Sequence, residues 1–274
     1  MPFPELSYAR DDDPAWKRWT IESIERLSGR ERLLPLYQRW RAEILPHSGR
    51  PMTDLLKLIN VTLAVDGRWP MAVDPGLPLV MIANHPFGIG DGMAMLAMAE
   101  TLARPYRVLI NNNLMKIPEV RPYALPIDFS GSDTAKVFNV RSRAEARRLL
   151  AQGVTIVVFP AGGVATARFP FGRAEELPWG TFTAGLVQQS RASVLPVYFE
   201  GQNSWAFHLA SHIGKTARLS MLVSEFRRFV GSRVVAHVGA VVPFETLAGH
   251  GDRRALTGEL FGLVQSLSPR PRRP

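Results

Sequence analysis

The 274-residue sequence contains no cysteine. This absence excludes disulfide bonds, metal sites built from thiolates and a cysteine nucleophile. No apolar run approaches the roughly 20 residues that a membrane-spanning helix needs. The first residues also lack the basic segment followed by an apolar stretch that marks a signal peptide. We therefore expect a cytoplasmic protein that, if it acts on lipids, lies on the inner face of the membrane without crossing it.

Acidic residues are fewer than basic ones: the sequence has 24 Asp and Glu and 33 Lys and Arg, which gives a net charge of +9. This excess favours anionic partners such as nucleic acid, anionic lipid headgroups, acidic carrier proteins or phosphorylated cofactors. No aromatic and basic motif of a known nucleic-acid-binding module is present, so we expect no nucleic-acid partner. Hydrophobic residues make up 46% of the chain, which is typical of a globular domain.

The first 60 residues predict amphipathic helices. Asp13 and Pro14 are a good helix start, and this helix is expected over residues 14–27. Pro35 interrupts the next segment, which predicts a second helix that starts near it and ends at Ile44. A third helix is expected over residues 53–60. Half of the six tryptophans lie in this region beside Lys and Arg: Trp16, Trp19 and Trp40. This composition suits a lipid–water interface, and equally a helical hairpin with a solvated basic face.

Strands and helices alternate from residue 61 onward, which predicts an α/β fold with a mixed, largely parallel sheet flanked by helices. The expected strands cover residues 61–65, 79–83, 107–110, 124–127, 154–159, 194–199 and 234–238. The expected helices cover residues 92–102, 134–150, 181–190, 206–212, 217–229 and 253–267. The simplest partition is an N-terminal helical extension over residues 1–60, one α/β domain over residues 61–267 and a basic tail over residues 268–274.

The chemistry-bearing segment follows the buried strand 79–83. His85 stands at the carboxyl end of this strand, where open α/β sheets place their ligands. Histidine is well suited to take a proton near neutral pH. Asp91 follows across a turn rich in glycine, so its carboxylate can fold back onto a ring nitrogen and stabilise the imidazolium. The alternative is that His85 and Asp91 only cap the turn and the helix.

A nucleotide-binding loop is a competing interpretation of the glycines in residues 88–92. The dinucleotide fingerprint needs glycine at the position where Met93 stands. The residues His85 to Phe87 also intervene between the strand and the glycines. We therefore disfavour nucleotide binding.

A second segment, Phe159 to Ala165, also follows a strand. Backbone N–H groups of a turn at Gly162 and Gly163 can cradle an anion or an oxyanion. Arg168 and Arg173 follow and are candidates for holding phosphate. The alternative is an ordinary loop between a strand and a helix.

The ordered blocks resemble the PlsC-type glycerolipid acyltransferase superfamily. They are Asn84-His85 with Asp91 downstream, the Phe-Pro-x-Gly block that starts at Phe159, and a late strand around Leu195-Pro196-Val197. The spacer between His85 and Asp91 is longer than in the phospholipid enzymes. This longer spacer, the Phe-Pro-Ala-Gly block and residues 198–204 resemble the corresponding features of the hemolysin-like branch. That branch includes lyso-ornithine-lipid O-acyltransferases.

The resemblance implies direct acyl transfer without a cofactor or metal. His85, held by Asp91, would deprotonate a hydroxyl of a lyso-lipid, an aminolipid or a lysophospholipid. The oxygen would then attack the thioester of acyl-CoA or acyl carrier protein. The substrate-binding residues expected from these blocks are Asn84, Phe87, Gly88, Pro160, Gly162, Gly163, Arg168 and Arg173.

Two departures from the superfamily pattern concern the acceptor site. Ala161 stands where the phospholipid enzymes have a glutamate, and Gly163 stands where the hemolysin-like branch usually has one. Residues 125–129 lack the arginine that binds the acceptor phosphate in the phospholipid enzymes. These losses argue against lysophosphatidic acid as the acceptor. They also motivate an alternative function, a catalytically weak lipid- or acyl-carrier-binding protein of the same fold.

His208 and His212 have the spacing of a zinc-binding helix. A zincin has glutamate directly after the first histidine, and Leu209 stands there instead. We therefore expect two ordinary histidines and no metal site.

Overall fold

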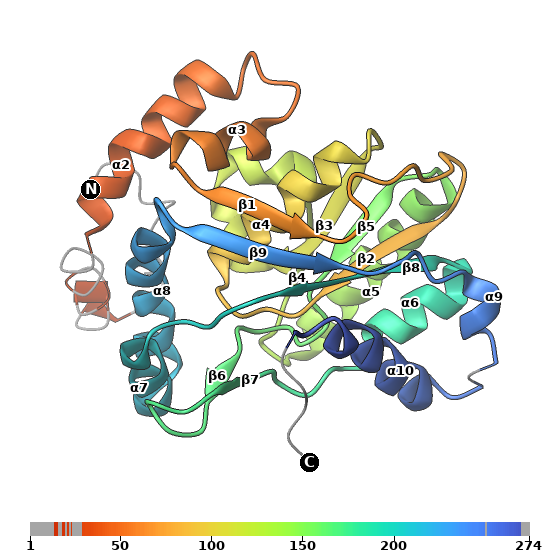
Figure 1. Cartoon of the computed structure of the whole chain (residues 1–274). Helices are drawn as coiled ribbons and strands as arrows, with labels where there is room; N and C mark the ends of the chain where they lie inside the picture. The colour runs from red at the N-terminus through yellow and green to blue at the C-terminus, as the bar shows by residue number, and fades with distance from the viewer. Residues whose placement is uncertain are drawn as a thin grey trace.

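The computed structural model describes residues 29–249 and 251–269, together with residues 14, 15, 18, 19, 21 and 23. Seven strands form one sheet with helices on both of its faces (Figure 1). Their bounds are β1 (Thr62–Asp66), β2 (Leu79–Ala83), β3 (Tyr106–Asn111), β4 (Ala124–Ile127), β5 (Thr155–Val158), β8 (Ser193–Phe199) and β9 (Arg233–Val238). The α/β prediction and all seven predicted strands are confirmed.

The sheet has the order β1-β9-β8-β2-β5-β3-β4. Every neighbouring pair is parallel except β8 and β9, which are antiparallel. The strands β8, β2, β5, β3 and β4 therefore end at one common edge of the sheet. A short antiparallel hairpin, β6 (Thr166–Ala167) with β7 (Ala174–Glu175), lies outside the sheet and was not predicted, because its strands are too short to show alternation.

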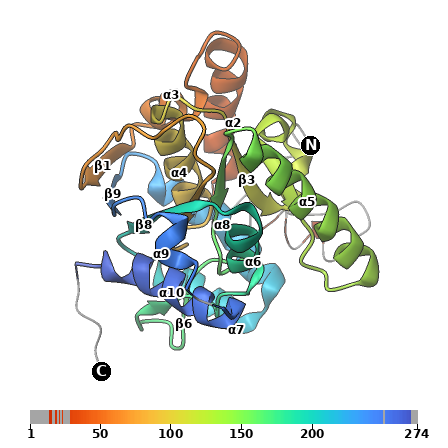
Figure 2. The ribbon, with the colours of Figure 1, turned by 90° about the vertical axis from the view of Figure 1, so that its right-hand side faces the viewer.

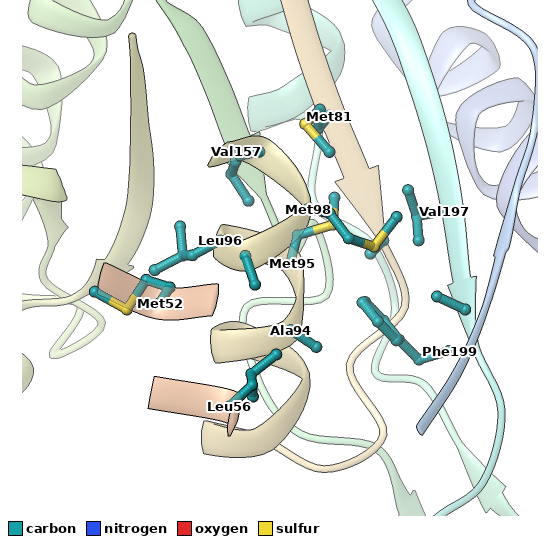
Figure 3. Close-up of a cluster of buried hydrophobic side chains, with 14 of the residues drawn as sticks. Met52, Leu56, Met81, Ala94, Met95, Leu96, Met98, Val157, Val197 and Phe199 are labelled. Atoms are coloured by element: carbon teal, nitrogen blue, oxygen red, sulfur yellow. The ribbon is translucent and has the colours of Figure 1, made fainter. Parts of the chain in front are cut away.

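The central strand β2 shows how the sequence divides the core. Leu79, Met81 and Ala83 belong to the core on one face, while Val80 and Ile82 belong to the core on the other. All five are fully buried, as expected of a parallel strand covered on both sides. Figure 3 shows the first core, in which Met81 and other sheet residues face α4, whose labelled side chains include Met95 and Met98.

Helices cover both faces of the sheet, with α3 and α4 on the first core and α5, α6 and α10 on the second (Figure 2). The helix bounds are α2 (Arg30–Arg39), α3 (Pro51–Leu58), α4 (Ile89–Thr101), α5 (Asp133–Ala151), α6 (Phe182–Ser190), α7 (Trp205–Ile213), α8 (Lys215–Phe229), α9 (Phe244–Leu247) and α10 (Arg253–Ser266). A π-helical turn, η2 (Trp40–Ile44), and two 3₁₀ turns, η3 (Asn112–Lys116) and η4 (Pro118–Tyr123), complete them. Side chains of Ser132, Ser204 and Asp252 cap α5, α7 and α10.

The N-terminal helices differ from the prediction. α2 begins at Arg30, so Pro35 lies inside the helix and does not start it. The backbone hydrogen bond that this proline removes is offset by the packing of Leu36 and Tyr37 against the first core. Trp40 is buried in the first core, and its Nε1 donates to the carbonyl of Pro51 at 3.0 Å. Trp40 is therefore a packing residue and not an interfacial one, whereas Trp19 is exposed. Most of the predicted helix over residues 14–27, with Trp16, lies outside the described residues.

The pair α7 and α8 packs beside α2 and the hairpin β6–β7 (Figure 1). α8 also contacts α4, the helix that follows the His85 loop. Helices α2, α4 and α8, which are distant in sequence, therefore pack together near the carboxyl end of β2. In the described part of the chain, every helix is too short or too polar to cross a bilayer.

Candidate active site

Two loops meet where the paired strands β2 and β5 end. His85 lies in the loop after β2, and Phe159 begins the loop after β5. The backbone N–H of Ala165 donates to the carbonyl of His85 at 2.8 Å. The ring centroids of His85 and Phe159 lie 4.3 Å apart. The parallel pairing thus brings the two sequence blocks into direct contact.

His85 and Asp91 form the central pair of this site. Nδ1 of His85 lies 2.9 Å from Oδ1 of Asp91, whose side chain is fully buried. The other carboxylate oxygen accepts a hydrogen bond from the N–H of Phe87 at 2.8 Å. Asp91 lies in the first turn of α4, and the helix dipole stabilises a negative charge there. The preceding Gly88 has a φ of 85° and a ψ of −99°, a conformation that glycine adopts readily and that folds the loop back.

A second carboxylate, that of Glu176, binds the backbone of the same loop. Its Oε1 accepts a hydrogen bond from the backbone N–H of His85 at 2.6 Å, and its Oε2 accepts one from Nε1 of Trp179 at 2.7 Å. Burial raises the pKa of Glu176 above its usual range. Sequence reasoning missed Glu176, because no local pattern links it to a histidine so far away in the chain.

The pKa of His85 reflects opposing effects. Burial of the ring lowers this pKa, and the charge of Asp91 and the contact with its carboxylate raise it. The charge of Glu176 also raises it, and that of Arg218 lowers it. The net result is a pKa above the ordinary value of histidine. Nδ1 faces Asp91, so Nε2 is the nitrogen that can exchange a proton with a ligand.

A cavity of about 790 Å³ opens at His85. Its wall is mostly apolar and comes from both ends of the chain. The wall includes Leu33, Leu36 and Tyr37 of α2, Met93 and Leu96 of α4, and Leu219, Leu222 and Phe226 of α8. Ligand sites of this size combine apolar walls with a few polar groups. The arrangement suits an extended apolar chain whose reactive end lies at a histidine.

A family model described as an acyltransferase matches residues 52–226, which is more than half of the chain. The chain belongs to this acyltransferase family. The match contains His85, Asp91, Glu176 and Arg218, so all four lie within the family's own region of the sequence. The resemblance of the sequence blocks to acyltransferases is thereby confirmed.

Two curated relatives are similar to this acyltransferase chain, and both are named lyso-glycine lipid O-acyltransferase. The protein of Phocaeicola vulgatus is 28% identical over 176 residues, which cover 60% of this chain and 59% of that protein. The protein of Bacteroides thetaiotaomicron is 29% identical over 142 residues, which cover 49% and 47%. The matched region thus spans about half to three fifths of these relatives. The solved PlsC structure from Thermotoga maritima, a 1-acyl-sn-glycerophosphate acyltransferase, has a TM-score of 0.48 at 18% identity, covering 94% of this chain and 83% of that one.

Three of the residues expected to bind substrate in this acyltransferase line the cavity: Gly88, Gly162 and Gly163. The N–H of Gly162 donates to the carbonyl of Phe159 at 3.0 Å and so closes the turn. Within the described residues, the N–H of Gly163 has no hydrogen-bond partner. Gly163 is therefore the better candidate for an oxyanion donor.

The other expected substrate-binding residues do not line the cavity. The buried side chain of Asn84 donates to the carbonyl of Phe199 at 2.9 Å and accepts from its N–H at 2.6 Å, so it ties β2 to β8. Phe87 packs on Phe229 at a centroid distance of 6.0 Å. We reassign Asn84 and Phe87 to positioning the loop. Pro160 begins the turn after β5 and does not line the cavity. Arg168 and Arg173 are exposed on the β6–β7 hairpin.

The two histidines with helical spacing bind backbone. His208 is buried, and its Nδ1 accepts a hydrogen bond from the N–H of Ala167 at 3.3 Å. Nε2 of His212 lies 3.1 Å from the carbonyl of Ala167. Both rings therefore fasten α7 to the hairpin strand β6.

A cation that the sequence blocks did not reveal also lines the cavity. Arg218 of α8 is half-buried, and its Nη2 donates to the carbonyl of Val164 at 2.7 Å. Burial lowers the pKa of its guanidinium, which nevertheless stays charged at neutral pH. Nothing in the sequence indicated this role, because Arg218 is one arginine on a helix far along the chain from the His85 loop.

Proposed function

We propose that this chain transfers a fatty acyl group from an acyl thioester to a hydroxyl of a lyso-lipid. The observation that carries the proposal is the His85–Asp91 pair, which opens directly into a large apolar cavity. The family match and the names of the two relatives support acyl transfer to a lysolipid. The proposed donor is acyl-CoA or acyl carrier protein, and the proposed acceptor is an aminolipid or a lysophospholipid.

In the proposed mechanism, His85 is the general base. Its Nε2 takes the proton of the acceptor hydroxyl while that oxygen attacks the carbonyl carbon of the thioester. Asp91 stabilises the imidazolium that forms, and the N–H of Gly163 stabilises the oxyanion. The tetrahedral intermediate collapses as the C–S bond breaks, and the leaving thiolate takes the proton from His85. The product is an ester and a free thiol, with no covalent acyl-enzyme.

We further propose that the chain works on the inner face of the membrane without crossing it. Two features support this location: the proposed acceptor is a lipid, and the chain is strongly basic at +9. Basic surfaces are attracted to the anionic lipids of the cytoplasmic leaflet.

The replacement of His85 by alanine tests the proposal. We expect acyl transfer from an acyl thioester to a lyso-lipid to fall by about 10²–10⁴-fold, the usual contribution of a positioned base. The matched control is His47→Ala, which removes an exposed histidine outside the cavity. Near wild-type transfer by His85→Ala would show that the mechanism is wrong.

A catalytically weak lipid- or carrier-binding protein is the alternative. It is favoured by Ala161 and Gly163, which bring no carboxylate into the cavity. It predicts binding of an acyl thioester without turnover on any of a panel of lyso-lipid acceptors. Turnover on a single acceptor removes this alternative.

A further inference from the structure

Arg218 is a half-buried cation without a carboxylate partner. Its hydrogen bond to the carbonyl of Val164 leaves most of the five guanidinium N–H groups for other acceptors. Across the part of the chain that the structure describes, no Asp or Glu side chain lies within ion-pair distance of it. The guanidinium carbon of Arg218 lies over the ring of Phe207, 5.8 Å from its centroid. Partial burial of an unpaired charge is costly, so the site is suited to an anion that arrives from outside.

The position of Arg218 relates this charge to the proposed reaction. Arg218 and His85 line the same cavity. Arg218 holds the carbonyl of Val164, and the next residue, Ala165, donates to the carbonyl of His85. One short stretch of backbone therefore joins the guanidinium to the base. An anion bound by Arg218 would therefore share the cavity with the group that His85 is proposed to deprotonate.

Gly163 lies beside Arg218, and a Cβ atom at this position would meet Cδ1 of Leu177 at 2.8 Å, so that side chain would have to move. A Cβ atom at position 163 would lie 3.5 Å from Nη2 of Arg218. An acidic side chain there would reach the guanidinium and neutralise it. With glycine at this position, the carboxylate that pairs with Arg218 has to come from the ligand.

We propose that Arg218 binds a carboxylate in the headgroup of the acceptor lipid, and so determines acceptor specificity. This inference rests on the proposed acyl transfer. A guanidinium binds a carboxylate through two parallel hydrogen bonds, which fixes orientation as well as charge. A carboxylate in the headgroup lies a few bonds from the reacting hydroxyl, which suits the position of Arg218 in the same cavity as His85. The phosphate of a pantetheine donor is separated from its thioester by the whole pantetheine arm.

The test compares two acceptors with one acyl-CoA donor: lyso-glycine lipid and its methylamide, which lacks the carboxylate. We expect wild-type protein to prefer the free acid through a lower KM. In Arg218→Gln the KM for the free acid rises by about ten- to a hundredfold, the usual effect of losing a hydrogen bond to a charged group. The KM for the methylamide and for acyl-CoA stays unchanged. Arg218→Lys keeps part of the preference for the free acid over the methylamide. Gly163→Glu loses this preference, as Arg218→Gln does.

Three results would overturn the assignment. If wild-type protein uses both acceptors equally well, the assignment is wrong, and no variant is needed to show it. A proportional fall in kcat for both acceptors shows that Arg218 only supports the structure. A rise in the KM for acyl-CoA alone shows that the anion belongs to the donor. Absence of wild-type turnover on every lyso-lipid is a different result, which refutes the proposed function itself.

An independent observation concerns the surface next to this cavity. Trp205, Leu209 and Ile213 recur every four residues and form one exposed stripe along α7. The ring of Phe171, which is 83% exposed, stacks on Trp205 at a centroid distance of 5.4 Å. Phe169 from the same hairpin loop is also exposed. These five side chains form an apolar surface, which we call the α7–hairpin surface.

The α7–hairpin surface has the chemistry of a membrane contact. Large aromatic and aliphatic side chains gathered on one face mark an interaction site, and tryptophan favours the lipid–water interface. The exposed residues Arg168 and Arg173 flank the hairpin loop and suit anionic headgroups. Ser211 of the same helix lines the cavity, so α7 contributes to both this surface and the cavity wall. We infer that this surface docks on an anionic lipid bilayer, from which the acceptor enters the cavity.

Sedimentation with vesicles tests this docking surface. Full-length protein is mixed with phosphatidylcholine vesicles that do or do not contain phosphatidylglycerol. We expect Phe171→Ser with Ile213→Ser to weaken binding to the anionic vesicles by about tenfold or more, because each side chain loses apolar burial. The matched control is Val137→Ser with Val140→Ser, two exposed valines on α5. Unchanged vesicle binding in the first variant, or loss of binding to acyl carrier protein alone, would overturn the inference.

Discussion

The carboxylate of Glu176 accepts a hydrogen bond from the backbone N–H of His85 at 2.6 Å, while Asp91 approaches the ring of the same histidine at 2.9 Å. The candidate base is thus held by one carboxylate at its backbone and another at its side chain. Glu176 is fixed in turn by Nε1 of Trp179. This arrangement couples the position of the His85 loop to the segment that follows the β6–β7 hairpin.

Replacement of Glu176 by glutamine should change the pH dependence of acyl transfer. His85 has to be neutral to act as a base, so activity falls as the pH drops through its raised pKa. Loss of the Glu176 charge lowers that pKa, and we expect the acid limb of kcat/KM to move to lower pH. The matched control is Glu175→Gln, which removes an exposed neighbour that pairs with Arg168. Superimposable pH profiles for wild type and Glu176→Gln would contradict this role.

Replacement of Asp91 by asparagine should lower kcat by about 10²–10⁴-fold, because the imidazolium loses its counter-charge. The acid limb should also move to lower pH. Steady-state kinetics with a fixed acyl thioester measure both effects. Asp133→Asn, at a fully solvated position in the first turn of α5, serves as the control. A variant that keeps the wild-type kcat would reduce Asp91 to a helix-capping residue.

Two glycines of α4 should respond in opposite ways to alanine. A Cβ atom at Gly90 would lie 2.4 Å from the ring of Phe229, whereas one at Gly92 meets no atom within 4 Å. We expect Gly90→Ala to destabilise the protein by about 1–3 kcal/mol through overpacking. Gly92→Ala should stabilise it by about 0.5–1 kcal/mol, since alanine favours the helix. Denaturant unfolding measures both, and equal stabilities would show that Gly90 is not tightly packed.

Gly92 should also control the length of the acyl chain. It lines the cavity and has open space at its Cβ position. We expect Gly92→Leu to occupy part of the cavity and to shift the preference towards shorter acyl donors. Competition assays with acyl-CoA mixtures measure the shift. Gly258→Leu on α10 is the matched control, because Gly258 also has open space but lies outside the cavity. An unchanged chain-length preference would place the acyl chain elsewhere.

The sequence predicted the sheet well, because strands buried on both faces are continuous apolar runs such as residues 79–83. It also predicted the pair His85 and Asp91, which lie in one loop and make a local contact. Glu176 and Arg218 could not be found this way. Their partners, His85 and Val164, lie far away in the chain, and only the folded sheet edge brings them together.

Trp40 shows a further limit of sequence reasoning. Tryptophan beside basic residues on a short helix predicts a surface position equally with a packed one. The indole is buried because α3 supplies the carbonyl of Pro51 as a hydrogen-bond acceptor and the first core surrounds the ring. This environment depends on how two helices pack, which amphipathic periodicity does not specify.

The helices before the sheet form part of the cavity wall, since Leu33 and Leu36 of α2 and Leu55 of α3 face the same space as His85. Part of the wall that would contact the acyl chain therefore belongs to a stretch of sequence separate from the His85 loop. Changes in α2 and α3 can alter which chains are accepted while the His85 loop is left intact. To that extent, selectivity for fatty acids can evolve separately from catalytic rate.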